Sequence, residues 1–217
     1  MSDNQIVTWF DLNTMEVLPP GWIEDIYGVI AGSARAVEMQ GESSTSREEL
    51  NASIKYEVVT GDVIRERLPW LWNLYEHQFV GFATSVAGRP MKISKFEKSA
   101  INMNVLNGTE ARYEWHVDSN PLTGLVYVNS LTQEDGGELV FEVGGRHVPV
   151  YPRSGHLAFF DARELPHTVM PLKKDLCRIS IPMNFFFAEE DEVRPADLDD
   201  HIYGPSVSAS PHIRGDV

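Results

Sequence analysis

The spacing of hydrophobic residues changes near the middle of the chain. Residues 22–38 and 69–86 carry apolar side chains at helical intervals, and Pro69 suits the first turn of the second segment. Asp62 is a candidate cap for a shorter helix, and residues 6–12 are a short strand candidate. The first 99 residues are therefore expected to form a helix-rich support.

After residue 100, short alternating runs are separated by Gly, Pro, Asn and Asp, a spacing typical of antiparallel sandwiches and barrels. The strand candidates are Ile101–Leu106, Tyr113–His116, Gly124–Asn129, Glu138–Val143, His147–Tyr151, His156–Phe160, His167–Met170 and Cys177–Phe187. The pattern predicts a mainly β fold with supporting helices. Residues 100–188 would be its jelly-roll core, with the helices against one of two sheets.

The length of 217 residues predicts a single domain spanning residues 1–217. Residues 41–46 are expected to be a loop. Residues 189–217 form an acidic tail that is expected to be solvated and partly mobile, with a lid over a site as the alternative.

The formal net charge of −14 argues against nucleic acid or an anionic membrane surface as a partner. No apolar run approaches the roughly 18 residues of a membrane span. Cys177 is the single cysteine, and the first residues lack a signal-peptide pattern, so a cytoplasmic protein without disulfides is expected. The sequence indicates nothing about oligomeric state.

His116 and Asp118 are the first candidates for chemistry. Residues i and i+2 of a strand point to the same face, so this imidazole and carboxylate can converge on one metal ion. His167 follows 49 residues after Asp118, in another strand candidate. Two histidines and one carboxylate on one face of an octahedron leave open positions, as in non-heme Fe(II) oxygenases.

Arg178 and Ser180 also share one face of their strand candidate. A buried guanidinium beside a hydroxyl is suited to hold a small dicarboxylate through bidentate hydrogen bonds. For Arg178 alone, a surface or structural ion pair would be the simpler interpretation. Next to the metal-ligand set, a cosubstrate site is favoured.

These motifs, in this order, resemble the Fe(II)/2-oxoglutarate-dependent oxygenases, in particular their prolyl 4-hydroxylase-like branch. The matching residues are His116 and Asp118, Gly136–Phe141, Pro152–Phe160, His167 with Val169 and Pro171, and Arg178 with Ser180. The resemblance implies a double-stranded β-helix that binds Fe(II) through His116, Asp118 and His167. It further implies that 2-oxoglutarate chelates the iron and pairs with Arg178, that O₂ is consumed, and that succinate and CO₂ are released.

Two positions refine what the resemblance implies. Arg178 stands where many prolyl hydroxylases have Lys, which argues against a peptidyl substrate. Asp118 stands where the related radical halogenases have Gly or Ala, which favours hydroxylation or a related oxidation. Residues 115–124 also resemble oxygenases of free amino acids and other small molecules. The expected substrate is therefore small and amino-acid-like, in a specialised biosynthetic pathway.

Three asparagines are secondary candidates. Asn104 precedes the first ligand and is expected to touch 2-oxoglutarate, whereas Asn120 and Asn184 are predicted substrate contacts. Trp115 alternates away from His116 and is expected in the core. The remaining histidines are assigned to structural roles or to positions outside the metal site. They are His77, His147, His156, His201 and His212.

Three other functions compete with a small-molecule oxygenase. A peptidyl or protein hydroxylase would use the same chemistry with a different groove. A jelly-roll binding module would keep the metal ligands without turnover, but it would need no cosubstrate site. A zinc or manganese enzyme of the cupin type would usually carry a His-x-His pair, which this chain lacks.

Overall fold

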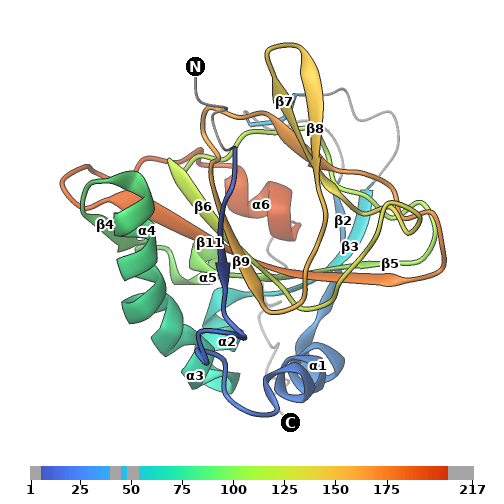
Figure 1. Ribbon diagram of the computed structural model, residues 1–217, viewed down its shortest axis with the longest axis horizontal. Helices are drawn as coiled ribbons and strands as arrows, with labels where there is room; N and C mark the ends of the chain where they lie inside the picture. Colours follow the sequence, from blue (N-terminus) through green and yellow to red (C-terminus); the bar gives the residue numbers. More distant parts are fainter. Residues whose placement is uncertain (1–5, 40–44, 48–53, 205–217) are drawn as a thin grey trace, which may run out of the picture.

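The computed structural model describes residues 6–39, 45–47 and 54–204 (Figure 1). Two antiparallel sheets form the body of the protein. The larger sheet has the strand order β1-β9-β6-β11-β5-β3-β2, with β4 pairing with β11, and the smaller one has the order β10-β7-β8. The strands of the larger sheet are β1 (Thr8–Asp11), β2 (Arg35–Met39), β3 (Ile54–Val59), β4 (Met91–Ile93), β5 (Met103–Asn107), β6 (Leu122–Tyr127), β9 (His156–Asp161) and β11 (Cys177–Phe187). Those of the smaller sheet are β7 (Leu139–Val143), β8 (Arg146–Val150) and β10 (His167–Val169).

The central strand β11 shows how the larger sheet separates the core from the site. Its odd-numbered residues Ile179, Ile181 and Met183 pack in the hydrophobic cluster shared with the helices. Its even-numbered residues Arg178 and Ser180 point to the other face, because side chains alternate along a strand. A second hydrophobic cluster, which includes residues of the smaller sheet, lies on the same face of the larger sheet as Arg178 and Ser180.

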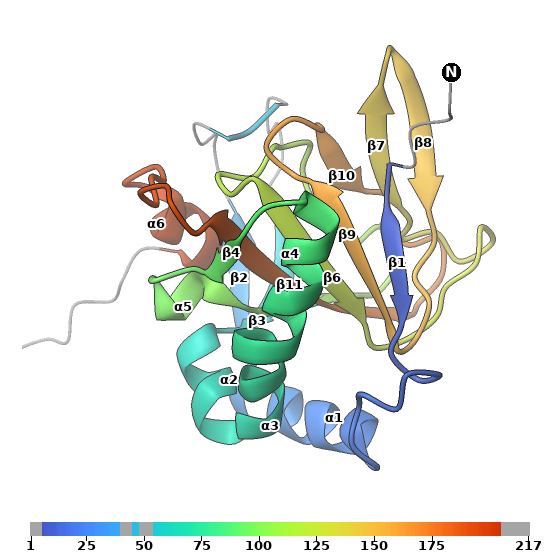
Figure 2. The same ribbon diagram turned by 60° about the vertical axis from the view of Figure 1, so that its left-hand side comes forward.

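The helices of the first half of the chain cover the opposite face of the larger sheet. Figures 1 and 2 show α2 to α4 on one side of it and the β7–β8 hairpin on the other. The helical elements are α1 (Trp22–Ser33), α2 (Gly61–Arg67), α3 (Pro69–Asn73), the π-helical segment η1 (Leu74–Phe79), α4 (Val80–Ala87), α5 (Glu97–Ala100) and α6 (Leu198–Tyr203). A side chain at Gly61 would place its Cβ 2.0 Å from the carbonyl oxygen of Glu97, so glycine permits α2 and α5 to pack closely.

The mainly β architecture with supporting helices and a jelly-roll core is confirmed. The helical run predicted from Pro69 is also confirmed, and it contains the π-helical segment η1. A single helix over residues 22–38 was wrong, because the helix ends at Ser33 and residues 35–39 form β2. Val37 and Met39 alternate into the core when β2 pairs with β3, a partner that the sequence pattern did not predict.

Three further expectations change. Thr60, rather than Asp62, occupies the N-cap of α2. Residues 113–116 form no strand, and among them only His116 makes isolated bridges, to Ser46 and His167. The predicted acidic tail is described to residue 204, where it contains the helix α6. Its remainder, like residues 41–44 of the predicted loop, lies outside the described residues.

Among the residues described, no helix is long and apolar enough to cross a membrane.

Candidate metal centre

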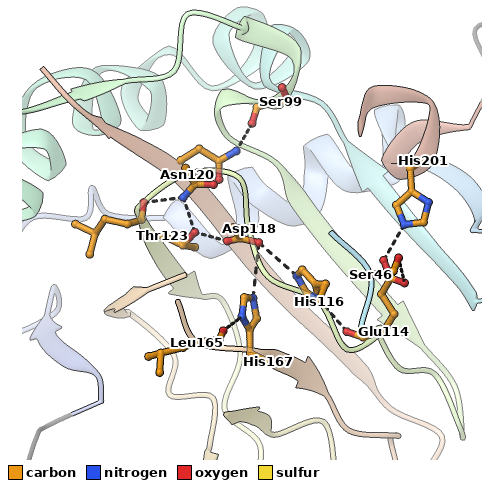
Figure 3. A network of polar contacts seen from close by, with 12 residues as sticks. Ser46, Ser99, Glu114, His116, Asp118, Asn120, Thr123, Leu165, His167 and His201 are labelled. Atoms are coloured by element: carbon orange, nitrogen blue, oxygen red, sulfur yellow. Dashed lines mark hydrogen bonds and ion pairs between the residues drawn. The ribbon is translucent and has the colours of Figure 1, made fainter. Parts of the chain in front are cut away.

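His116, Asp118 and His167 meet at one end of the two sheets. His116 and Asp118 belong to the extended segment between β5 and β6, and His167 begins β10. The amide of His116 donates to the carbonyl of His167 at 3.0 Å, and the reverse bond measures 2.9 Å. The amide of Asp118 donates to the carbonyl of Ala162 at 2.9 Å. Backbone bonds therefore hold the two ligand segments side by side (Figure 3).

The three side chains have the geometry of a metal site. One ligand atom from each lies within 4.8 Å of the others. The Nε2 atoms of His116 and His167 lie 3.4 Å and 3.7 Å from Oδ1 of Asp118. Each histidine places Nδ1 next to a backbone carbonyl, at 2.9 Å from that of Glu114 and 2.8 Å from that of Leu165. Donation from Nδ1 leaves the Nε2 lone pairs free for a metal ion.

The charges of this buried cluster are coupled. Burial opposes the charged form of His116, but its hydrogen bond to Asp118 and the charge of that carboxylate raise the pKa of His116. Burial also opposes the carboxylate form of Asp118, whereas the hydrogen bond from His116 and both imidazoles lower the pKa of Asp118. Burial and the neighbouring His116 lower the pKa of His167 to about 4. The metal-free cluster therefore holds its proton on His116.

This distribution predicts proton release on metal binding. His167 and Asp118 are already deprotonated near neutral pH, so Fe(II) must displace mainly the proton of His116. We expect release of about one proton per iron below the raised pKa of His116, and an affinity that falls about tenfold per pH unit there. Anaerobic calorimetry in buffers of different ionisation enthalpy measures this release. Release confined to pH values below about 5 would contradict the assignment.

Thr123 and Asn120 support the carboxylate ligand. The hydroxyl of Thr123, on β6, donates to Oδ2 of Asp118. Nδ2 of Asn120 in turn donates to Oγ1 of Thr123 and to the carbonyl of Leu122, both at 2.8 Å. Asn120 is buried, and both of its amide hydrogens are used within the protein. These bonds favour a positioning role for Asn120 over the predicted substrate contact.

Thr123→Val tests this support. Valine keeps the shape of the side chain but removes the hydroxyl that orients Asp118. Loss of such a ligand-orienting bond typically weakens metal binding or activity by about 10- to 100-fold. We expect a loss of Fe(II) affinity in this range, measured by anaerobic titration, with an unchanged circular dichroism spectrum. Thr168→Val is the matched control, because Thr168 is equally buried and donates to the carbonyl of Tyr113. Equal losses in both variants would contradict a specific role for Thr123.

Arg178 and Ser180 line a cavity that the three metal ligands also line. Arg178 is only 2% exposed, and its Nε donates to the carbonyl of Gly137 at 2.9 Å. Its Nη1 donates to Oγ of Ser180 at 2.7 Å. Nη2 of Arg178 and Oδ1 of Asn104 are buried without a hydrogen-bond partner among the described residues. A buried guanidinium with an unused donor fits an anionic ligand, because unsatisfied buried polar groups are costly.

The two glycines before β7 allow the backbone to approach Arg178 closely. Gly136 and Gly137 have φ angles of 75° and 71°. A Cβ at Gly136 would lie 2.2 Å from the carbonyl oxygen of Pro171, and one at Gly137 would lie 3.3 Å from Cδ of Arg178. Glycine therefore allows the Gly137 carbonyl to reach the guanidinium without strain.

One cavity of about 130 Å³ joins the metal ligands to Arg178, Ser180 and Asn104. Asn184 also lines it, although Nδ2 of Asn184 donates to the carbonyl of Ser99 at 2.8 Å. Trp115 is half-buried and lies against His147 with ring centroids 5.1 Å apart, which corrects its expected core position. His156 packs between Ser154 and Asp11, in the structural role expected of it.

Sequence reasoning missed Glu114 and misplaced His201. Both line the cavity, and Nε2 of His201 lies 2.7 Å from Oε1 of Glu114. His201 was set aside as a tail residue, and it remains outside the three-ligand group. Glu114 carries the same i, i+2 relation to His116 that singled out Asp118, so this signal was present in the sequence. Thr123 carried no such signal.

Comparisons with known proteins agree with this site. The family model of the 2OG-Fe(II) oxygenase superfamily matches residues 101–186. No curated protein sequence matches the chain. Among solved structures, the α-ketoglutarate-dependent epimerase SnoN from nogalamycin biosynthesis is 17% identical, covers 95% of this chain and 85% of its own, and has a TM-score of 0.64.

Two other structures show the same fold. A 2OG-Fe(II) oxygenase family oxidoreductase from Burkholderia pseudomallei is 12% identical and covers 88% of this chain and 90% of its own, with a TM-score of 0.67. HygX from Streptomyces hygroscopicus, solved with nickel and 2-oxoglutarate, is also 12% identical. The alignment covers 90% of this chain and 88% of HygX, with a TM-score of 0.63.

The matched segment contains all three metal ligands and Arg178. The ligand set fits Fe(II), and the buried guanidinium with its unused donor fits the dicarboxylate. The family model assigns residues 101–186 to the 2OG-Fe(II) oxygenase superfamily, a family of enzymes that use Fe(II), 2-oxoglutarate and O₂.

Proposed function

We propose that this oxygenase hydroxylates, or otherwise oxidises, an unactivated C–H bond of a small molecule and converts 2-oxoglutarate into succinate and CO₂. The observation that carries the proposal is the single cavity lined by the three metal ligands and by Arg178. A binding module without turnover would need no such combination. The narrower resemblance to the prolyl 4-hydroxylase-like branch stays a prediction.

The residues of this chain divide the work. His116, Asp118 and His167 would hold the iron, and Arg178 with Ser180 would hold the far carboxylate of 2-oxoglutarate. Asn104 on β5 is paired with Ser180 on the neighbouring strand β11, where its amide can reach the same ligand. Bound iron and 2-oxoglutarate supply the activation of O₂. The protein must then orient the substrate C–H bond and exclude water from the cavity.

The cavity wall limits the charge of the substrate. Among the described lining residues, Arg178 is the only Arg or Lys, and the dicarboxylate would occupy it. Apart from the metal ligands, the rest of the wall combines the paired side chains of Glu114 and His201 with hydroxyl groups, amides and apolar side chains. A free α-carboxylate would find no second guanidinium or ammonium group there. We therefore propose a neutral or cationic substrate, so that an amino-acid-like compound would carry its carboxyl group as an amide, ester or carrier linkage.

An anaerobic titration of the metal-free protein tests the reaction class without knowledge of the substrate. Fe(II) followed by 2-oxoglutarate should produce the visible charge-transfer band of a chelated 2-oxo acid, saturating at about one equivalent. Binding of iron without this band would contradict the cosubstrate site. The band would still form in a catalytically silent protein, so turnover must be measured separately.

Succinate release over matched pairs of compounds tests the substrate class. Free amino acids are compared with their amides, and short peptides provide the peptidyl alternative. We expect release with neutral or cationic members of the pairs and none with the free carboxylates. Turnover of full peptides alone would favour the peptidyl hydroxylase instead.

A further inference from the structure

The short helix α6 forms one wall of the cavity. Leu198, His201 and Ile202 line it, and their spacing places all three on one face of the helix. No residue of α6 is fully buried, and neither Leu198 nor Ile202 packs against a hydrophobic core cluster, whereas the partly buried Tyr203 does. The position of this wall therefore depends on polar contacts more than on core packing.

Besides the ion pair of Asp199 with Arg194 and a hydrogen bond from Tyr203 to the carbonyl of Lys98, three polar contacts fasten α6 to the body of the protein. The hydroxyl of Tyr203 donates to Oδ1 of Asn102 at 2.6 Å, and the hydroxyl of Tyr56 donates to the carbonyl of Ile202. The third contact joins His201 to Glu114 and is the one that faces the metal site. Figure 3 shows His201 reaching from α6 toward Glu114, beside the segment that carries His116 and Asp118.

Glu114 connects three segments that lie far apart in the sequence. One carboxylate oxygen contacts His201, and the other accepts a hydrogen bond of 2.8 Å from Oγ of Ser46. The Glu114 backbone carbonyl lies 2.9 Å from Nδ1 of His116. The Glu114 and His201 side chains are 2% and 7% exposed, so the pair is shielded from water. Removing one partner would leave the other buried without its hydrogen bond.

We infer that His201 and Glu114 are positioning residues that hold α6 in place as the substrate-side wall of the cavity. The pair lies outside the three-ligand metal group, so its role is to place the wall rather than to bind iron. That this wall faces a substrate rests on the function proposed above, whereas the position of α6 does not depend on that function. Loss of the pair should loosen α6 and leave the central sheet intact, because that sheet has its own core.

Hydrogen–deuterium exchange of the metal-free protein tests this inference. In His201→Ala, the amides of α6 should exchange at least about tenfold faster, while those of β6 and β11 keep their protection. His201→Gln can still donate to Glu114 and should restore slow exchange. His77→Ala is the matched control, because His77 is an exposed histidine in the helical segment η1. Unchanged exchange of α6 in His201→Ala would overturn the inference, and so would a uniform increase across all elements.

A chemical probe of the wall gives a second measurement. Leu198→Cys, in a Cys177→Ser background, places a thiol on the cavity face of α6. Its reaction with iodoacetamide should accelerate when His201 is also replaced by Ala and should return toward the starting rate with Gln. Equal labelling rates in all three proteins would contradict a fastening role. Neither measurement requires iron or 2-oxoglutarate, so failure of the charge-transfer titration would overturn the proposed function and leave this test intact.

Discussion

His167→Ala is expected to give a folded protein that neither retains Fe(II) nor turns over. His167 is buried, and its imidazole supplies one of only three ligand atoms in the described group. Its backbone bonds to His116 do not need the side chain, so the two segments should stay together. Loss of a ligand should weaken iron binding by more than the roughly 100-fold that loss of a ligand-orienting bond can cause. Anaerobic iron titration and succinate release measure both effects.

His156→Ala is the matched control for the ligand variant. His156 is a half-buried strand histidine that contacts Ser154 and Asp11 and lies outside the metal group. This variant should keep the iron affinity and the charge-transfer band of the unaltered protein. Turnover retained by His167→Ala, or an equal loss of iron in both variants, would contradict the assignment of the metal centre.

Arg178→Gln is expected to keep iron binding and to weaken 2-oxoglutarate binding severely. The guanidinium has an unused, buried Nη2 donor, and no other Arg or Lys among the described residues lines the cavity. Truncating one partner of a buried, hydrogen-bonded charge pair costs about 2–5 kcal/mol. The concentration of 2-oxoglutarate that half-saturates the charge-transfer band should therefore rise by roughly 30-fold to several thousand-fold.

Arg146→Gln provides the control for the loss of one positive charge. Arg146 lies on β8, is exposed, and does not line the cavity of the metal site. Its replacement should leave the half-saturating concentration within about twofold, since exposed charges contribute little. A similar 2-oxoglutarate requirement in the two variants would show that Arg178 does not hold the cosubstrate.

Much of the core could be predicted because its signals are local. β9 is a short apolar run, β11 alternates between apolar and polar residues over most of its length, and both are bounded by turn residues, so the pattern gave both with close bounds. The spacing of His116 and Asp118 made them candidate ligands, and His167 with the ordered motifs around it supported that prediction. By contrast, residues 35–39 read as the end of a helix, because the partner strand that makes them β2 comes later in the chain and was not predicted.

The amino-acid pattern was enough to predict the strands of the core, the candidate ligand set His116, Asp118 and His167, and the shared face of Arg178 and Ser180. Each of these depends on residues a few positions apart or on an ordered set of motifs. The hydrogen bonds of Thr123 to Asp118 and of Asn120 to Thr123, and the contact of His201 with Glu114, come from tertiary packing. The last pair is separated by 87 residues, and its contact exists because the fold brings α6 next to the segment that carries Glu114. No local pattern encodes such a contact, since side-chain hydrogen bonds over this separation depend on the packing of the whole fold.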